Sequence, residues 1–138
     1  MERRYRFLEH TADAGVEIES PDLAGVYETA GRALFDLMAP GPGPAEVPGT
    51  VVSEGVDRAD LLVNFLNELL FRFETEGLLF RAFRTRSLDG GRLEMETRAE
   101  PLAGREERVE AVVKAVTRHG AVVEREGEGW RAVVFFDL

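Results

Sequence analysis

Apolar residues alternate along the last strand that the sequence predicts, residues 130–137, and they occupy both of its faces. One face carries four apolar side chains, which belong to Trp130, Ala132, Val134 and Phe136. The other face carries Val133 and Phe135, a pattern typical of a strand buried on both sides. Its end bears two negative charges, the Asp137 side chain and the expected α-carboxylate of Leu138. Because holding them close costs repulsion, we expect a cation or basic group there; the alternative is that both point into water.

Two segments show the spacing of three and four residues that is typical of amphipathic helices. The first has its apolar stripe from Leu23 to about Met38, after Ser20 as the expected N-cap and Pro21 at the expected first helical position. The second lies between Asp57, an expected N-cap, and Gly77, which suits the position after a helix. Its apolar stripe consists of Leu61, Leu62, Phe65, Leu66, Leu69, Leu70 and Phe73. Leucine and phenylalanine at this spacing indicate core packing, not a cofactor site.

Further strands are predicted where residues alternate or form short apolar runs beside turn residues. These strands are residues 4–8, 15–19, 50–53, 78–87, 92–99, 109–116 and 121–126. The last should pair with residues 130–137 across Gly127–Gly129, and Asp89–Gly91 predicts a second hairpin. We expect residues 100–108 to be loop, and the proline and glycine run at 40–44 to be a spacer. Grouped strands predict an α+β fold with two long helices packed on mostly antiparallel β-sheet, in one domain spanning residues 1–138.

Composition excludes several classes of function. The formal net charge of −9 argues against strong direct binding to nucleic acid, because such proteins usually carry a basic surface. The absence of cysteine excludes disulfides, thiolate catalysis and cysteine-ligated metal sites. No apolar run approaches the roughly 20 residues of a membrane span, and residues 1–5 are too polar for a signal peptide. We therefore expect a cytoplasmic protein with no membrane partner.

The chain contains 17 basic residues, and Lys114 is its only lysine. Ammonium and guanidinium groups differ in geometry and in how readily their pKa shifts, so one interpretation is that this position requires an ammonium. The other interpretation is drift in codon usage that left a single lysine.

Charged and histidine side chains gather at three predicted strand ends. These ends are His10 to Asp13, Lys114 to His119, and Asp137 to Leu138. A sheet that placed them side by side would form an oxygen-rich set from Asp13, Asp137 and the Leu138 carboxylate. Such a set suits a divalent cation, with Ca²⁺ as the first candidate and Mg²⁺ or Mn²⁺ as others, while the histidines keep Zn²⁺ open. Taken singly, His10 could instead bond to backbone, and Asp13 could stabilise a turn.

Five stretches match, in order and spacing, the motifs of one known family. They are His10-Thr11-Ala12-Asp13, Phe65-Leu66-Asn67-Glu68-Leu69-Leu70, Glu76-Gly77, Lys114-Ala115-Val116-Thr117 with His119, and Asp137-Leu138. Together they resemble the archease family from about Tyr5 to the end of the chain, although no single motif is specific.

The resemblance implies an α+β fold and a function that hydrophobic patterns do not show. That function is a protein cofactor, not an enzyme, of the RtcB-type RNA ligase that joins tRNA halves in tRNA splicing, promoting its guanylylation by GTP and its multiple turnover. The resemblance also implies a metal site formed by Asp13, Asp137 and the Leu138 carboxylate, and it matches Lys114 to the lysine of the third motif. His10 and His119 lie within matching stretches and are further candidates for contact with the ligase.

Two positions depart from the family pattern. Arg118 stands where the family often has tyrosine, which we expect to leave the site intact. Residues 99–109 lack the Gly-Glu pair and the histidine expected in that loop, so a metal or ligase contact from the loop is in doubt.

Two rival functions remain open. A small metal-dependent phosphoester hydrolase would use the same carboxylates with His10 or His119 as base, but no basic cluster is present to grip phosphate. A general chaperone would need a large exposed apolar patch, which a sequence does not show.

Overall fold

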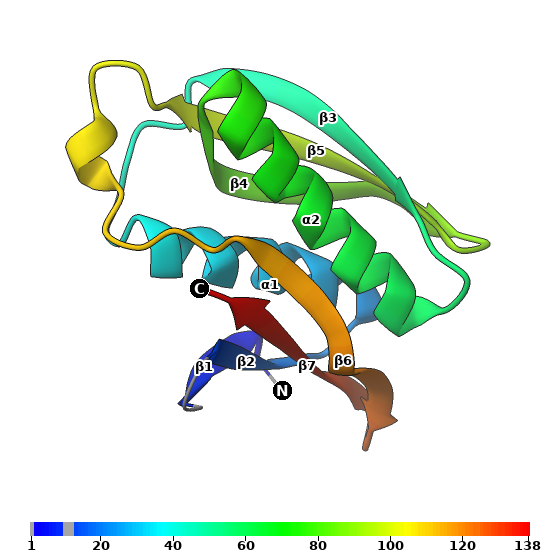
Figure 1. Ribbon diagram of the computed structural model, residues 1–138. Helices are drawn as coiled ribbons and strands as arrows, with labels where there is room; N and C mark the ends of the chain where they lie inside the picture. Colours follow the sequence, from blue (N-terminus) through cyan, green and yellow to red (C-terminus); the bar gives the residue numbers. More distant parts are fainter. Residues whose placement is uncertain (1, 10–12) are drawn as a thin grey trace.

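The computed structural model describes residues 2–9 and 13–138, which form strands, two long helices and one short 3₁₀ turn (Figure 1). The strands are β1 (Arg4–Glu9), β2 (Asp13–Ser20), β3 (Val47–Glu54), β4 (Leu78–Asp89), β5 (Arg92–Pro101), β6 (Ala115–Glu126) and β7 (Gly129–Asp137). The helices are α1 (Leu23–Met38) and α2 (Arg58–Glu76), and the 3₁₀ turn η1 covers Glu106–Arg108.

The strands form two antiparallel sheets with the helices between them. One sheet has the strand order β1-β2-β7-β6, and the other has the order β3-β5-β4. Helix α1 packs against β2 and β4, and α2 packs against β3 and β6, so both helices contact both sheets (Figure 1). The predicted α+β fold, with two long helices packed on antiparallel sheet, is confirmed.

The N-cap of helix α1 differs from the predicted one. The Asp22 carboxylate accepts a hydrogen bond from the Gly25 N–H at 2.8 Å, while the Ser20 hydroxyl donates to the Asp22 carbonyl at 2.7 Å. Asp22 is therefore the N-cap, and the prediction of Ser20 is wrong. Asp22 still has an extended backbone, with φ of −130°, so the helical turn can start only after it. The helix ends at Met38, with Ala39 as its C-cap, before a proline that cannot continue it.

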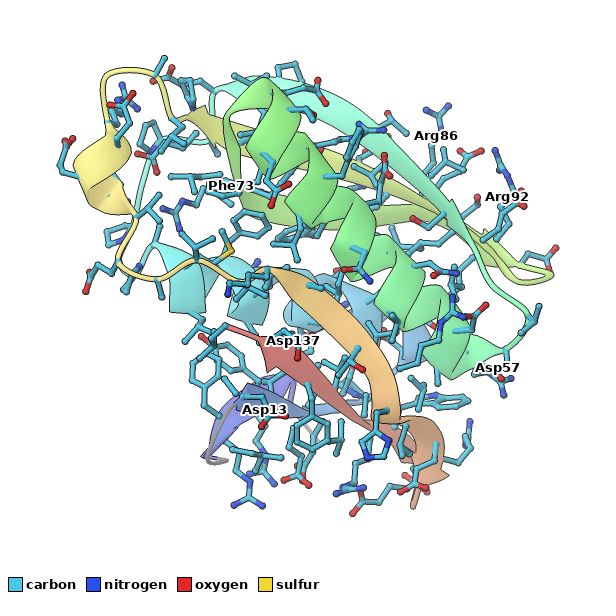
Figure 2. The ribbon with its side chains drawn as sticks, viewed as in Figure 1. Asp13, Asp57, Phe73, Arg86, Arg92 and Asp137 are labelled. Atoms are coloured by element: carbon cyan, nitrogen blue, oxygen red, sulfur yellow. The ribbon has the colours of Figure 1, made fainter. Side chains whose placement is uncertain are left out.

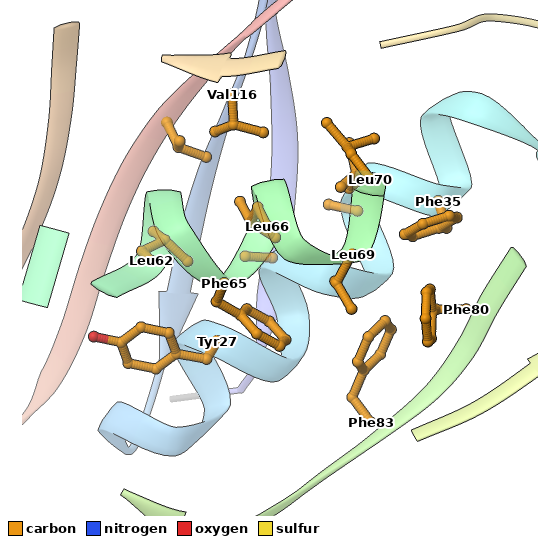
Figure 3. Packing of buried hydrophobic residues seen from close by; sticks show 14 of the residues in the cluster. Tyr27, Phe35, Leu62, Phe65, Leu66, Leu69, Leu70, Phe80, Phe83 and Val116 are labelled. Carbon is orange, nitrogen blue, oxygen red and sulfur yellow. The ribbon is translucent and has the colours of Figure 1, made fainter. Parts of the chain in front are cut away.

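The predicted caps of α2 are confirmed. Asp57 accepts from the Asp60 N–H at 2.8 Å, and Gly77 ends the helix with φ of 65°, which costs glycine little. The fully buried members of its apolar stripe include Leu62, Phe65, Leu66 and Leu69 (Figure 3). Within the described ranges, neither α1 nor α2 is long and apolar enough to cross a membrane.

The predicted strand at residues 109–116 is wrong over most of its length, because β6 begins only at Ala115. The N–H groups of Glu110 and Ala111 donate to the Met38 carbonyl at 2.7 and 3.2 Å, so the first part of this segment bonds to the end of α1, and a bond to β7 appears only at Lys114. The alternation that suggested a strand reflects the burial of Val113, which has no exposed surface. An extended segment with one buried anchor has the same local pattern as a strand.

Strands β3 and β6 are both longer than predicted. Pro48 and Gly49 are tolerated within β3 because it is an edge strand, where the backbone on the outer side has no neighbouring strand to bond. β6 is continuous to Glu126, but its pairing with β7 is irregular between Thr117 and Val122. The sequence predicted two strands there.

The predicted loop at residues 100–108 begins with a buried carboxylate instead. Strand β5 extends to Pro101, and Glu100 is only 1% exposed. One Glu100 oxygen lies 3.1 Å from Arg81 Nη2, and the other lies 3.1 Å from Arg108 Nε. Arg81, the more deeply buried partner of this charge, lies on β4, so the local pattern of residues 100–108 did not reveal it.

Candidate functional site

Strand β7 brings the two predicted acidic stretches together. It lies between β2 and β6, and Asp137 is opposite Asp13 on one side and Ala115 on the other. Directly opposed residues of antiparallel strands point to the same face, with Cβ atoms about 4.5–5.5 Å apart. Asp13 and Asp137 therefore present two carboxylates side by side at one end of the sheet, an arrangement we call the acidic pair (Figure 2).

The acidic pair differs from Glu17, a carboxylate on the same sheet, in having no basic partner among the described residues. On the same face, Glu17 lies 2.7 Å from Arg6 and 2.7 Å from Arg131, and hydrogen bonds from these two side chains lower the pKa of the Glu17 carboxyl. Neither Asp13 nor Asp137 forms an ion pair with another residue that the structure describes. Like charges directly opposite one another destabilise a sheet, so a cation bound here would stabilise the fold.

Lys114 lies immediately beside the acidic pair. Its backbone N–H donates to the Asp137 carbonyl at 2.8 Å, and its side chain is exposed. The ammonium forms no ion pair within residues 2–9 and 13–138. The chain's single lysine is therefore held by its backbone against Asp137, while its exposed side chain stays available to a partner.

The Asn67 amide fixes the strand that follows Lys114. Its Nδ2 donates to the Val116 carbonyl and its Oδ1 accepts from the Val116 N–H, both at 2.9 Å. These are the two bonds that a neighbouring strand would otherwise supply to the edge of β6. One turn earlier on α2, Asn64 Oδ1 accepts from the Arg118 guanidinium at 2.9 Å. Helix α2 therefore covers the outer edge of β6 next to the site.

Replacing Asn67 with alanine should lower the free energy of unfolding by about 1–3 kcal/mol, because both backbone groups of Val116 lose their partner. Urea denaturation followed by circular dichroism measures the loss. Thr75→Ala is the control, since it removes one exposed hydrogen bond of 2.8 Å to the Phe71 carbonyl. Its expected effect is within about 0.5 kcal/mol. Equal effects of the two substitutions would show that water replaces the Asn67 amide without cost.

His119 lies on the irregular part of β6, away from the acidic pair itself. The next residue, Gly120, packs against the Phe135 ring, since a Cβ added there would come within 2.9 Å of it. Gly15 on β2 packs against the same ring, where an added Cβ would come within 2.7 Å. Phe135 precedes Asp137 by two residues and shares its face of β7. The structure thus places His119 at the border of the sheet face that carries the carboxylates, but not opposite them.

The acidic pair has the donor atoms of a site for a hard divalent cation. Carboxylate oxygens are the ligands that Ca²⁺, Mg²⁺ and Mn²⁺ prefer. In the described part of the chain, no three His, Asp or Glu side chains lie close enough to hold a metal. A third protein ligand would be the Leu138 carboxylate, directly after Asp137, or His10, which lies outside the described residues. The metal site therefore stays a prediction.

Comparison with known proteins covers almost the whole chain. A model of the archease protein family matches residues 5–138. The chain belongs to the archease family. An archease of Methanopyrus kandleri is 34% identical over 135 residues, which cover 95% of this chain and 96% of the relative. An archease of Thermococcus gammatolerans is 34% identical over 142 residues, which cover 99% of each.

Solved structures agree with the archease assignment. The solution structure of Methanobacterium thermoautotrophicum protein 1598 superposes with a TM-score of 0.74 at 32% identity, covering 97% of this chain and 98% of that one. The crystal structure of a Thermotoga maritima protein, described as an archease and possible chaperone, gives a TM-score of 0.66 at 21% identity, covering 95% and 94%. The second likeness shows the shared fold alone.

Sequence reasoning missed two residues that shape this archease site. Asn67 entered only as part of a motif, although Asn64 and Asn67 are three residues apart and so place two amides on one helical face. That spacing could have indicated contacts with a strand edge. Phe135 gave no comparable signal, because the two glycines that pack against its ring lie on other strands.

Proposed function

We propose that this chain is a protein cofactor that activates an RtcB-type RNA ligase in tRNA splicing, promoting its guanylylation and multiple turnover. The observation that carries the proposal is the acidic pair of Asp13 and Asp137, with Lys114 bonded beside it at 2.8 Å. Support comes from the family, since the archease model matches residues 5–138, a range that contains all three residues. A cytoplasmic location is part of the proposal.

In this proposal the site residues have separate roles. Asp13, Asp137 and the Leu138 carboxylate would hold a divalent cation, with Ca²⁺ as the first candidate and Mg²⁺ or Mn²⁺ as others. The bound cation would offset the repulsion between the carboxylates and offer positive charge to anionic groups of the ligase site. Lys114 contributes an ammonium with three N–H donors, which suits phosphate oxygens of a nucleotide. Its backbone bond to Asp137 keeps that donor next to the carboxylates.

A ligation assay tests the proposal. The ligase is given GTP, a divalent cation and RNA halves, with and without substoichiometric amounts of this protein. We expect several ligations per ligase molecule, and faster accumulation of guanylylated ligase, only when the protein is present. No stimulation at any ratio would refute the proposal. Hydrolysis of a phosphodiester or nucleotide by the protein alone would favour the phosphoester hydrolase, with His119 as a candidate base.

Extending the chain beyond Leu138 should weaken cation binding and activation far more than stability. The extension converts the α-carboxylate into a neutral amide and obstructs the space beside Asp137, so one ligand is lost. The melting temperature should change little, because removing one negative charge also relieves repulsion near the acidic pair. Calorimetric titration with Ca²⁺ and the ligation assay measure the two effects, and a tag placed before Met1 is the control. Full activation by the extended protein would exclude the terminal carboxylate as a ligand.

A further inference from the structure

Exposed apolar side chains gather around Lys114. The large apolar residues that are substantially exposed in the described part of the chain are Phe7, Val52, Val56, Phe71, Val112 and Leu138. Of these, Phe71 is 58% exposed, Val112 is 53% exposed and Leu138 is 49% exposed. Phe71 lies on α2, Val112 lies in the segment before β6, and Leu138 directly follows β7. The hydrogen bonds between α2, β6 and β7 place all three near Lys114.

The position of Phe71 follows from how α2 runs along β6. Asn64 bonds to Arg118 and Asn67 bonds to Val116, each at 2.9 Å, so the helix and the strand run in opposite directions. One further helical turn advances about 6 Å along α2, which equals about two residues of extended chain. Phe71 is one turn beyond Asn67 and therefore lies beside Lys114.

Val112 and Leu138 reach the same place along the backbone. Val113 is fully buried, so its neighbours Val112 and Lys114 both point outward in this extended segment. Leu138 follows Asp137, whose carbonyl accepts from the Lys114 N–H at 2.8 Å. Three exposed apolar side chains are thus expected near the Lys114 ammonium, which has no ion pair among the described residues.

We propose that Phe71, Val112 and Leu138 form the docking surface for the RNA ligase, an inference that rests on the proposed function. Monomeric proteins expose contiguous apolar surface mainly where they bind something, and this surface is continuous with Lys114 and the acidic pair. Charge favours the ligase as occupant. An enzyme that binds RNA presents basic surface, which attracts a chain of formal net charge −9, whereas a second copy of this chain is repelled.

The docking surface and the charged residues then have different tasks. Apolar side chains at the centre of an interface set its affinity, and Lys114 with the acidic pair acts once the complex has formed. Substitutions in the docking surface should weaken binding without lowering the activation reached at saturation. Substitution of Lys114 should do the reverse.

Fluorescence titration of the ligase with labelled protein tests the docking surface. Phe71→Ser and Val112→Ser should each raise the Kd by about tenfold or more, while saturating amounts still activate fully. Val56→Ser is the matched control, since Val56 is 94% exposed and lies before α2, at the opposite end of the helix from Phe71. It should leave the Kd unchanged, and circular dichroism verifies that all three variants fold.

Binding and activation are read separately, so the two proposals can fail independently. An unchanged Kd in both docking variants, with the wild-type protein binding the ligase, would overturn the docking surface. A self-associating wild-type protein that becomes monomeric in Phe71→Ser would also overturn it, by assigning the surface to a second copy. Weakened binding in the variants, with a wild-type protein that binds but does not stimulate, would support the surface and refute the activator function.

Discussion

Replacing Lys114 with alanine is expected to reduce ligation to the level of the ligase alone. The substitution removes the one ammonium beside the acidic pair, and the exposed side chain has no partner among the described residues whose loss would unfold the protein. The free energy of unfolding should change by less than about 0.5 kcal/mol, because exposed charges contribute little to stability. The ligation assay and thermal unfolding, run on the same preparation, separate the two effects.

Two further substitutions sharpen this test. Lys114→Arg keeps the charge but replaces a compact ammonium with a planar guanidinium, and it should be impaired if the partner needs the smaller donor. Arg98→Ala removes another exposed cation, on β5, that lacks an ion-pair partner in the described structure, and it should leave activation unchanged. Full activation by Lys114→Arg would show that this position does not require an ammonium, and the single lysine would then reflect drift in codon usage.

Replacing Glu100 with glutamine is expected to cost about 3–5 kcal/mol of unfolding free energy, the largest stability effect expected here. Glu100 is 1% exposed, and Arg81 beside it is 8% exposed, so the substitution leaves a guanidinium buried without its counter-charge. Arg108, which also contacts Glu100, donates to the Pro42 carbonyl at 2.8 Å and so holds the spacer loop after α1. Chemical denaturation should show a lower midpoint.

The pH dependence of this effect has a defined sign. Burial raises the pKa of Glu100, but hydrogen bonds from Arg108 and Arg81 lower it, and the net shift is downward. A carboxyl with a lowered pKa in the folded state contributes stability that is present above its unfolded pKa of about 4.3 and is lost as pH falls through the folded value. The difference between the wild-type protein and Glu100→Gln should therefore be full at neutral pH and shrink in acid.

Glu96→Gln provides the matched control for Glu100→Gln on the same strand. The Glu96 side chain is 41% exposed and lies 3.8 Å from Arg84 and 4.0 Å from Arg86, both of which are exposed. Loss of these contacts should change stability by less than about 0.5 kcal/mol. If the two glutamine variants were equally stable, the charge of the buried Glu100 would contribute no more to stability than the charge of the more exposed Glu96.

Local signals predicted the parts of the fold that local interactions determine. The caps of α2 at Asp57 and Gly77 were correct because both bonds close within one turn of the helix. The strand predicted at residues 109–116 was wrong because an extended segment bonded to Met38 has the same alternation as a paired strand. Glu100 was assigned to a loop because Arg81, its buried partner, lies on another strand, β4.

The candidate site could be predicted only in part for the same reason. Alternation identified the ends of strands at Asp13 and Asp137, and the family resemblance suggested that they belong together. Register, however, is set by the whole sheet, and spacing alone did not show that β7 would lie between β2 and β6. The Asn67 bonds to Val116 depend on the packing of α2 over a sheet edge, which the apolar stripe of that helix does not specify.

The central position of β7 also determines when the molecule can become active during its synthesis. A nascent chain that has not yet emerged from the ribosome through residues 129–137 has β2 and β6 with no strand to join them. Both helices and the sheet of β3, β4 and β5 can already form, so the growing chain should fold in two stages. Pairing β2 with β7 closes a long loop and is expected to be the slow stage. Asp13 meets Asp137 only then, so under the proposed function unfinished chains would not compete with finished ones for the ligase.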